Sequence, residues 1–186
     1  MDDTLPHKAD ILFVFAGDVQ RIQYAAKLIT RYSESTLICS QIDSLRIEKI
    51  IDTTPYQIKV ANYSSSTIDE ITFLKKHLGD NSIKNADILL LSSPYHMRRI
   101  SIMAAIEFRG KTDSNNFFFV PVEGNSVKNQ KDAFVKWWKT KKCISAVHSE
   151  LAKIGYYFIV YLNPFLNSDS IEMHIKGSKF TRNRSF

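Results

Sequence analysis

The stretch "ADILFVFAGDVQRIQYAAKLITRY", residues 9–32, decides the fold class of this 186-residue chain. From Ile11 to Ala16 it is apolar without alternation, which is typical of a central parallel strand covered on both faces. After Gly17 the spacing becomes helical, and one face carries Val19, Ile22, Ala25, Ala26 and Ile29. A buried strand, a tight turn and an amphipathic helix therefore open the chain.

Similar units follow along the sequence. Strands are predicted at 35–40, 56–61, 88–91 and 116–122, and helices at 44–52, 67–78, 97–110 and 133–154. Residues 156–162 fit either a continued helix or a strand. The helix after residue 66 shows a capping box, Thr67-x-x-Glu70, and Gly79 marks its expected end.

Strands that alternate with helices in units of ~30 residues imply βαβ crossovers. We therefore predict an α/β fold, a Rossmann-like three-layer sandwich with a mostly parallel, doubly wound sheet of about five strands. Residues 1–166 are expected to form a single domain. Residues 167–186 are expected to be a basic, weakly ordered tail.

Charge is distributed unevenly along the chain. Residues 1–125 hold 14 basic and 15 acidic side chains, whereas residues 126–186 hold 11 basic and 4 acidic. The basic C-terminal region suits an anionic membrane surface, although a solvated face followed by a tail is the simpler interpretation. No recognised nucleic-acid-binding module accompanies this charge, so nucleic acid is not a predicted partner.

Other sequence features limit which cellular compartment and which cofactors we expect. The chain has no run of ~18 apolar residues, and its start, "MDDTLPHKAD", differs from a signal peptide. We expect a cytoplasmic protein, or an envelope-associated one if a membrane anchor has been removed. Cys39 and Cys143 lie far apart, and no metal-binding motif is present, so no disulfide or metal is expected.

Polar residues follow each predicted strand. In open parallel sheets, ligands bind outside the carboxyl ends of the strands, where the strand order reverses. The residues at these places are Gly17, Asp18 and Arg21, then Ser40, then Ser64 and Thr67, and finally Ser92, Ser93, His96, Arg98 and Arg99. Asp18 is equally well explained as a helix N-cap, and His96 as a helix-start residue bonded to a carbonyl.

The segment "SSPYHMRR", residues 92–99, favours an anionic ligand. Two arginines in the first turn of a helix oppose its dipole at a cost of ~0.3–1 kcal/mol for each exposed charge, and a bound anion reverses that sign. Adjacent helical residues point about 100° apart. Only one of Arg98 and Arg99 is therefore expected to face the ligand together with His96.

The order of these features resembles the ElyC/SanA/YdcF-like bacterial family, whose members carry a domain of unknown function. The likeness covers about residues 10–160 and is carried by Gly17, Asp18, Arg21, Ala25, Ser40, Ser64, Thr67, Asp69, His96, Met97, Arg99, Trp137, Trp138 and Glu150. The chain departs from the usual pattern at Ala16 and Gln41, where the family has glycines, and at Ser66 and Glu70, where it has asparagines.

The resemblance implies a Rossmann-like domain that binds an anionic small molecule and is linked to cell-envelope biogenesis. The ligand would be phosphate-bearing or nucleotide-like, with S-adenosylmethionine as a candidate. Asp69 and Arg99 would be among its binding residues.

Two alternatives stay open at this point, and so does the question whether the protein is an enzyme. In a hydrolase or transferase, Ser92 or Ser93 would be the nucleophile, His96 the base and Asp18 the orienting acid. Against this, the chain lacks a G-x-S-x-G motif, and Pro94 stands where an oxyanion-hole amide is wanted. In a non-enzymatic adaptor, the polar site would be degenerate and the basic C-terminal region would bind a membrane or a partner.

Overall fold

A computed structural model describes residues 5–17, 19–40, 58–60, 66–109, 114–122 and 141–162. The chain divides into two compact units, Met1–Lys136 and Trp137–Phe186, and each is described by itself. The division falls before α6 (Lys141–Leu162), the helix that is described in the second unit. The boundary expected at residue 166 and the tail after it lie outside the described residues and stay predictions.

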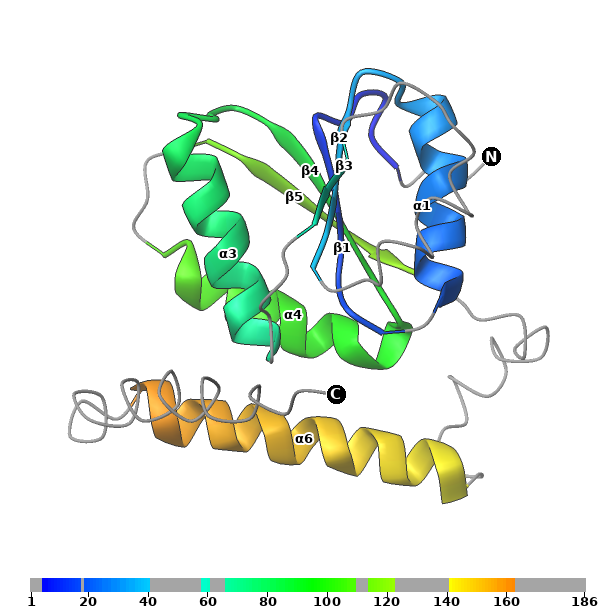
Figure 1. Ribbon diagram of the computed structural model, residues 1–186. Helices are drawn as coiled ribbons and strands as arrows, with labels where there is room; N and C mark the ends of the chain where they lie inside the picture. The colour runs from blue at the N-terminus through cyan, green and yellow to red at the C-terminus, as the bar shows by residue number, and fades with distance from the viewer. Residues whose placement is uncertain are drawn as a thin grey trace, which may run out of the picture. The chain divides into compact units, whose positions relative to one another are not determined.

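The first unit is built on a five-stranded parallel sheet with the strand order β3-β2-β1-β4-β5 (Figure 1). Every pair of neighbouring strands in it is parallel. The strands are β1 (Ile11–Val14), β2 (Thr36–Cys39), β3 (Ile58–Val60), β4 (Asp87–Ser92) and β5 (Asn116–Pro121). The parallel α/β sheet predicted from the sequence is thus confirmed.

Helices cover both faces of this sheet, as a doubly wound fold requires. They are α1 (Val19–Arg31), α3 (Thr67–Asp80) and α4 (Pro94–Glu107). Figure 1 shows α1 on one face and α3 with α4 on the other. The helix predicted at 44–52 lies outside the described residues.

The central strand β1 explains why the opening stretch lacks alternation. All four of its residues are buried. Leu12 and Val14 belong to the core cluster that includes Ile22 and Ala25 of α1, so Ile11 and Phe13 face the opposite layer. Burying a large apolar side chain contributes roughly 1.5–3 kcal/mol to the stability of the fold, and β1 buries such side chains on both of its faces.

Several element boundaries differ from the prediction for identifiable reasons. β1 ends at Val14 and not at Ala16, because the Ala16 amide donates to a side chain, Glu70 Oε1, at 2.7 Å. The predicted capping box of α3 is wrong: Ser66 is the N-cap, and its hydroxyl accepts from the Asp69 amide at 3.3 Å. α3 also continues through Gly79 to Asp80.

The segment 156–162, which the sequence left open, belongs to α6. The start predicted for this helix at residue 133 lies outside the described residues.

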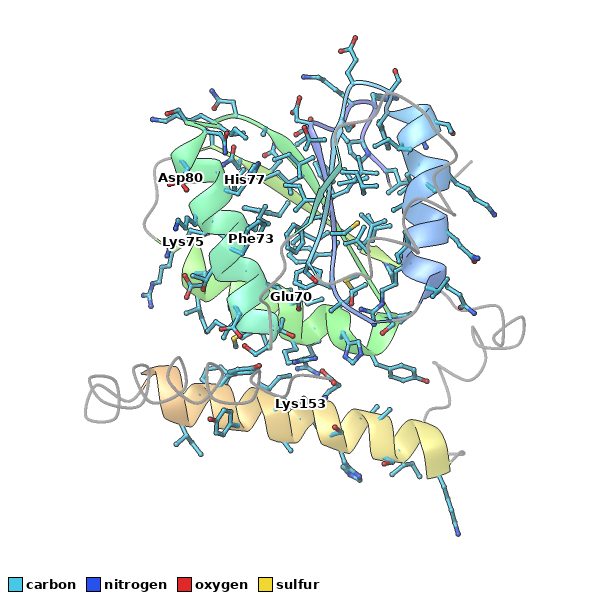
Figure 2. The ribbon with its side chains drawn as sticks, viewed as in Figure 1. Glu70, Phe73, Lys75, His77, Asp80 and Lys153 are labelled. Atoms are coloured by element: carbon cyan, nitrogen blue, oxygen red, sulfur yellow. The ribbon has the colours of Figure 1, made fainter. Side chains whose placement is uncertain are left out.

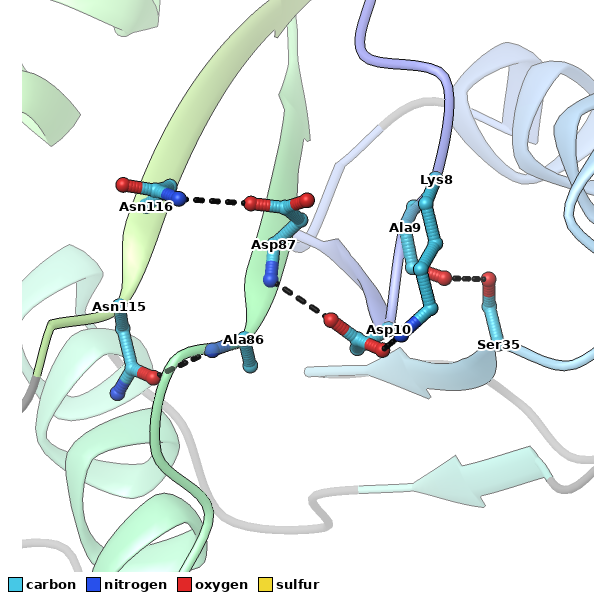
Figure 3. A network of polar contacts seen from close by, with 8 residues as sticks. All are labelled: Lys8, Ala9, Asp10, Ser35, Ala86, Asp87, Asn115 and Asn116. Carbon is cyan, nitrogen blue, oxygen red and sulfur yellow. Dashed lines mark hydrogen bonds and ion pairs between the residues drawn. The ribbon is translucent and has the colours of Figure 1, made fainter.

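A polar network closes the amino ends of β1, β4 and β5 (Figure 3). Asp10 pairs with Lys8 at 2.6 Å and accepts from the Asp87 amide at 2.8 Å, and the Asn116 amide group donates to Asp87 Oδ1 at 2.8 Å. These bonds pin three strand starts to one another. The groups at this edge of the sheet therefore satisfy one another.

The pKa of Asp10 makes this network sensitive to acid. Burial raises the pKa of the Asp10 carboxyl, but the hydrogen bonds from Lys8 and the Asp87 amide outweigh burial and hold the pKa below its ordinary value. A carboxyl whose pKa is lowered by folding stabilises the fold above its unfolded-state pKa of about 3.9. That stabilisation is lost as the pH falls through the folded-state value.

We expect Asp10→Ala to lower the free energy of unfolding by about 1 kcal/mol at pH 7, because the Asp87 amide loses its acceptor. The loss should shrink as the pH is lowered below about 4. Urea denaturation at a series of pH values measures both effects. Asp80→Ala, at the exposed end of α3, is the control, and a loss that does not change with pH would contradict the assignment.

Candidate functional site

The carboxyl ends of four strands lie in register along one edge of the sheet. The Phe15 amide donates to Leu91 O at 3.1 Å, the Ser40 amide to Val14 O at 3.0 Å, and the Val122 amide to Ser92 O at 2.7 Å. From β1 the chain moves outward through β2 and β3, then returns to the other side of β1 with β4. The strand order therefore reverses between β1 and β4, where ligands bind in folds of this kind.

Arg21 of α1 bridges this switch point. Its side chain is 5% exposed, and Nη1 donates to Phe15 O at 3.2 Å and to Ala16 O. Nη2 donates to Ser93 Oγ at 3.0 Å. The guanidinium thus ties the turn after β1 to the turn after β4.

The bond from Arg21 explains why the N-cap of α4 makes no side-chain cap. Ser93 is the N-cap of α4, yet its hydroxyl makes no capping hydrogen bond. Its oxygen accepts from Arg21 instead. Pro94 at the first helical position lacks an N–H, so the first turn has one donor fewer to satisfy.

Gly17 is required directly beneath the Arg21 guanidinium. Its φ of +143° is a backbone conformation that other residues rarely adopt. A Cβ at this position would lie 2.6 Å from Arg21 Nη1 and 2.7 Å from its Cζ. Both backbone conformation and space select glycine here.

Glu70 is a site residue that the sequence analysis assigned wrongly, as part of a capping box. It is 4% exposed, and its Oε1 accepts from the Ala16 amide at 2.7 Å and from the Ser40 hydroxyl. Figure 2 labels it in the first turn of α3. The sequence spacing does indicate that Glu70 is buried, because Glu70, Leu74 and Leu78 stand four residues apart on the buried face of the helix.

Burial controls the protonation of Glu70. It raises the pKa of this carboxyl, although the bonds from Ser40 and the Ala16 amide and the positive charges of Arg21 and Arg99 act to lower it. A carboxyl with a raised pKa can hold a proton under conditions in which an exposed glutamate is ionised. Glu70 is therefore the acid or base candidate with the best physical support among the described residues.

Arg99 and His96 form a pair on α4. Arg99 is 8% exposed and Arg98 is exposed, as expected from their 100° separation. Arg99 Nη2 lies 3.3 Å from His96 Nδ1. Since a guanidinium only donates, Nδ1 accepts, and the neutral imidazole carries its proton on Nε2.

This tautomer bears on the hydrolase alternative. In a Ser-His-Asp triad, Nδ1–H donates to a carboxylate and Nε2 accepts from the serine. His96 shows the reverse arrangement, with Nδ1 accepting from Arg99. The geometry suits a hydrogen-bond donor better than the base of a serine hydrolase.

The remaining predicted site residues have different outcomes. Asp18 and Ser64 lie outside the described residues. Thr67 is buried at the start of α3, and Asp69 follows in the same turn. Ser92 Oγ is buried and has no hydrogen-bond partner among the described residues. The structure joins Gly17, Arg21 and Ser93 in one group, Ser40 and Glu70 in a second, and His96 and Arg99 in a third.

Other reactive and metal-ligating side chains also occur in the described part of the chain. Burial raises the pKa of the Cys39 thiol to about 12, so it is protonated and unreactive. No group of three His, Cys, Asp or Glu side chains within the described ranges is arranged to hold a metal ion. None of the described helices is both long and apolar enough to cross a membrane.

Comparison of the chain with protein-family models, with curated proteins and with solved structures finds no match. The resemblance to the ElyC/SanA/YdcF-like family therefore stays a prediction. The geometry at the strand ends carries the functional argument.

We expect Gly17→Ala to lower the free energy of unfolding by roughly 1–3 kcal/mol, because the new side chain strains the backbone and displaces Arg21. Thermal or urea unfolding measures this loss. In an Arg21→Ala background the clash disappears, and the cost of Gly17→Ala should fall. Gly79→Ala is the matched control: its Cβ would meet no atom within 4 Å in a helix, so it should stabilise by ~0.5–1 kcal/mol. Equal losses at both glycines would contradict this account.

Proposed function

We propose that the protein binds an anionic small molecule, phosphate-bearing or nucleotide-like, at the carboxyl ends of β1, β2 and β4. One observation carries the proposal: buried arginines from two different helices, Arg21 of α1 and Arg99 of α4, converge on the topological switch point. Their charges both act on the same buried carboxyl, that of Glu70. Guanidinium groups match phosphate oxygens in geometry as well as in charge.

The groups at this edge differ in their tasks. Arg21 holds the two turns in place through Phe15, Ala16 and Ser93. Arg99 and His96 supply donors from the first turns of α4, where the helix dipole also favours an anion. Arg99 is thus the arginine proposed to contact the ligand.

The accessible side of the site fits a ligand that approaches the backbone. Gly17 is exposed, and Ser93 and His96 are partly exposed, whereas Arg21, Arg99 and Glu70 are buried. Gly17 itself has no side chain and the Arg21 guanidinium packs against it, so an anion that arrives there lies next to buried positive charge.

The finer assignments rest on the family resemblance. S-adenosylmethionine as a candidate ligand, and a bacterial role in cell-envelope biogenesis, belong to the proposal in that sense. The tautomer of His96 favours binding over serine hydrolysis, and the transferase and adaptor alternatives stay predictions.

Thermal unfolding with a panel of ligands tests the proposal. The panel contains nucleotides, S-adenosylmethionine, lipid-linked sugar phosphates and inorganic phosphate. A ligand at 100 times its Kd should stabilise the protein by about 2.7 kcal/mol. If no member of the panel raises the Tm, the proposal fails.

The two neighbouring arginines provide a matched pair of variants. Arg99→Ala should weaken binding by about 10-fold or more, because a charge-assisted hydrogen bond contributes ~1.5–3 kcal/mol. Arg98→Ala removes the same charge from an exposed position and should change the Kd by less than about twofold. Isothermal titration calorimetry measures both values. Equal weakening by the two variants would show that only the general charge of α4 matters.

A further inference from the structure

We propose that Glu70 is a proton-linked binding residue of this site, so that the anion binds together with one proton, which Glu70 holds. This inference rests on the proposed function and adds to it the way in which the site selects the charge of its ligand. Three features carry it: the burial of Glu70, the hydrogen bonds to its Oε1 and the two arginines whose charges act on it.

Groups from four parts of the fold act on the Glu70 carboxyl. The turn after β1 contributes the Ala16 amide, and the end of β2 contributes the Ser40 hydroxyl. α1 contributes the charge of Arg21, and α4 contributes the charge of Arg99, which is hydrogen-bonded to His96. On its own helix, the neighbouring charged residue is Asp69, which is less buried.

Oε2 is the atom of Glu70 that takes the proton. Oε1 already accepts two hydrogen bonds, from the Ala16 amide and the Ser40 hydroxyl. Protonation at Oε2 leaves both of these bonds in place. It also converts Glu70 from a group that only accepts into one that can donate.

Ionised Glu70 and a bound anion compete for the same positive charge. An ionised Glu70 and a bound anion are both stabilised by Arg21 and Arg99, and they repel each other. An anion beside these arginines therefore favours the neutral form of Glu70. By linkage, lower pH must then favour binding of the anion.

The consequence is selection by charge. With Glu70 neutral, the positive charges of Arg21 and Arg99 act on the ligand without an adjacent carboxylate, which suits a doubly charged phosphate monoester. With Glu70 ionised, the same site suits a singly charged phosphodiester or carboxylate. The preference between the two classes should thus shift with pH.

Inorganic sulfate is the best probe of the linkage because its charge stays constant from pH 5 to 9. Isothermal titration calorimetry of the full chain in Tris and in HEPES at pH 7.5 gives the number of protons taken up, since the two buffers differ in ionisation enthalpy. We expect up to one proton per sulfate, and an affinity that falls up to 10-fold per pH unit once Glu70 is ionised. Dimethyl phosphate, with one charge, should show a weaker pH dependence.

Glu70→Gln is the decisive variant, because the amide keeps an acceptor for Ala16 and Ser40 and cannot ionise. It should bind sulfate at pH 8.5 at least several-fold more tightly than the natural protein, with no proton uptake attributable to residue 70. Glu107→Gln is the matched control, because Glu107 pairs with Lys75 at 2.8 Å, and it should leave the proton uptake unchanged. If Glu70→Gln fails to fold, the proton count of the natural protein still tests the inference.

The outcomes separate this inference from the proposed function. If neither sulfate nor any ligand of the thermal panel binds, both fail. If sulfate binds without proton uptake, or Glu70→Gln takes up the same number of protons, only the role of Glu70 is overturned. If the uptake disappears in His96→Gln and persists in Glu70→Gln, His96 is the proton-linked residue and the inference is wrong.

Discussion

The carboxyl of Glu70 holds together the ends of two neighbouring strands, and the rest of the site depends on that bond. A single oxygen accepts from the Ala16 amide after β1 and from the Ser40 hydroxyl after β2. The turn that follows Ala16 is thereby fixed, and Gly17 takes the conformation over which Arg21 packs. Arg21 in turn donates a hydrogen bond to Ser93 and so links this turn to the start of α4.

The two edges of the sheet use polar groups in opposite ways. At the amino ends of β1, β4 and β5, Asp10, Asp87 and Asn116 satisfy one another, and Lys8 balances the Asp10 charge. At the carboxyl ends, by contrast, charged groups are buried at a desolvation cost that raises the pKa of Glu70. The first edge therefore holds polar groups that satisfy one another, whereas the second holds the buried charges of the candidate site.

Much of the fold could be predicted from the sequence, because hydrophobic spacing reports burial directly. The apolar run of β1 and the helical pattern of α1 follow from which faces are covered, and the structure confirms both elements. The exact end of a strand could not be predicted where a side chain accepts the hydrogen bond of a backbone amide, as Glu70 does for Ala16. Ser66 and Thr67 both suit a cap position by residue type, and in the structure Ser66 is the cap, with its hydroxyl accepting from the Asp69 amide.

The candidate site was predicted in part. Gly17, Arg21, Ser40, Ser93, His96 and Arg99 could be placed at strand ends because parallel strands deliver their ends to one edge. Glu70 was missed because an acidic residue in the first turn of a helix is usually a solvent-exposed capping partner. Its spacing with Leu74 and Leu78 shows the buried face, but a pattern of spacing does not reveal which atoms a buried carboxyl meets.

The contact between Gly17 and Arg21 has an evolutionary consequence. While Arg21 is present, any side chain at position 17 clashes with its guanidinium within 3 Å. If Arg21 is lost first, the steric part of the constraint on position 17 disappears, although the positive φ still favours glycine, and a residue that settles there blocks the return of the arginine. The two positions are therefore epistatic, and we expect an arginine at position 21 only in descendants that keep glycine at position 17.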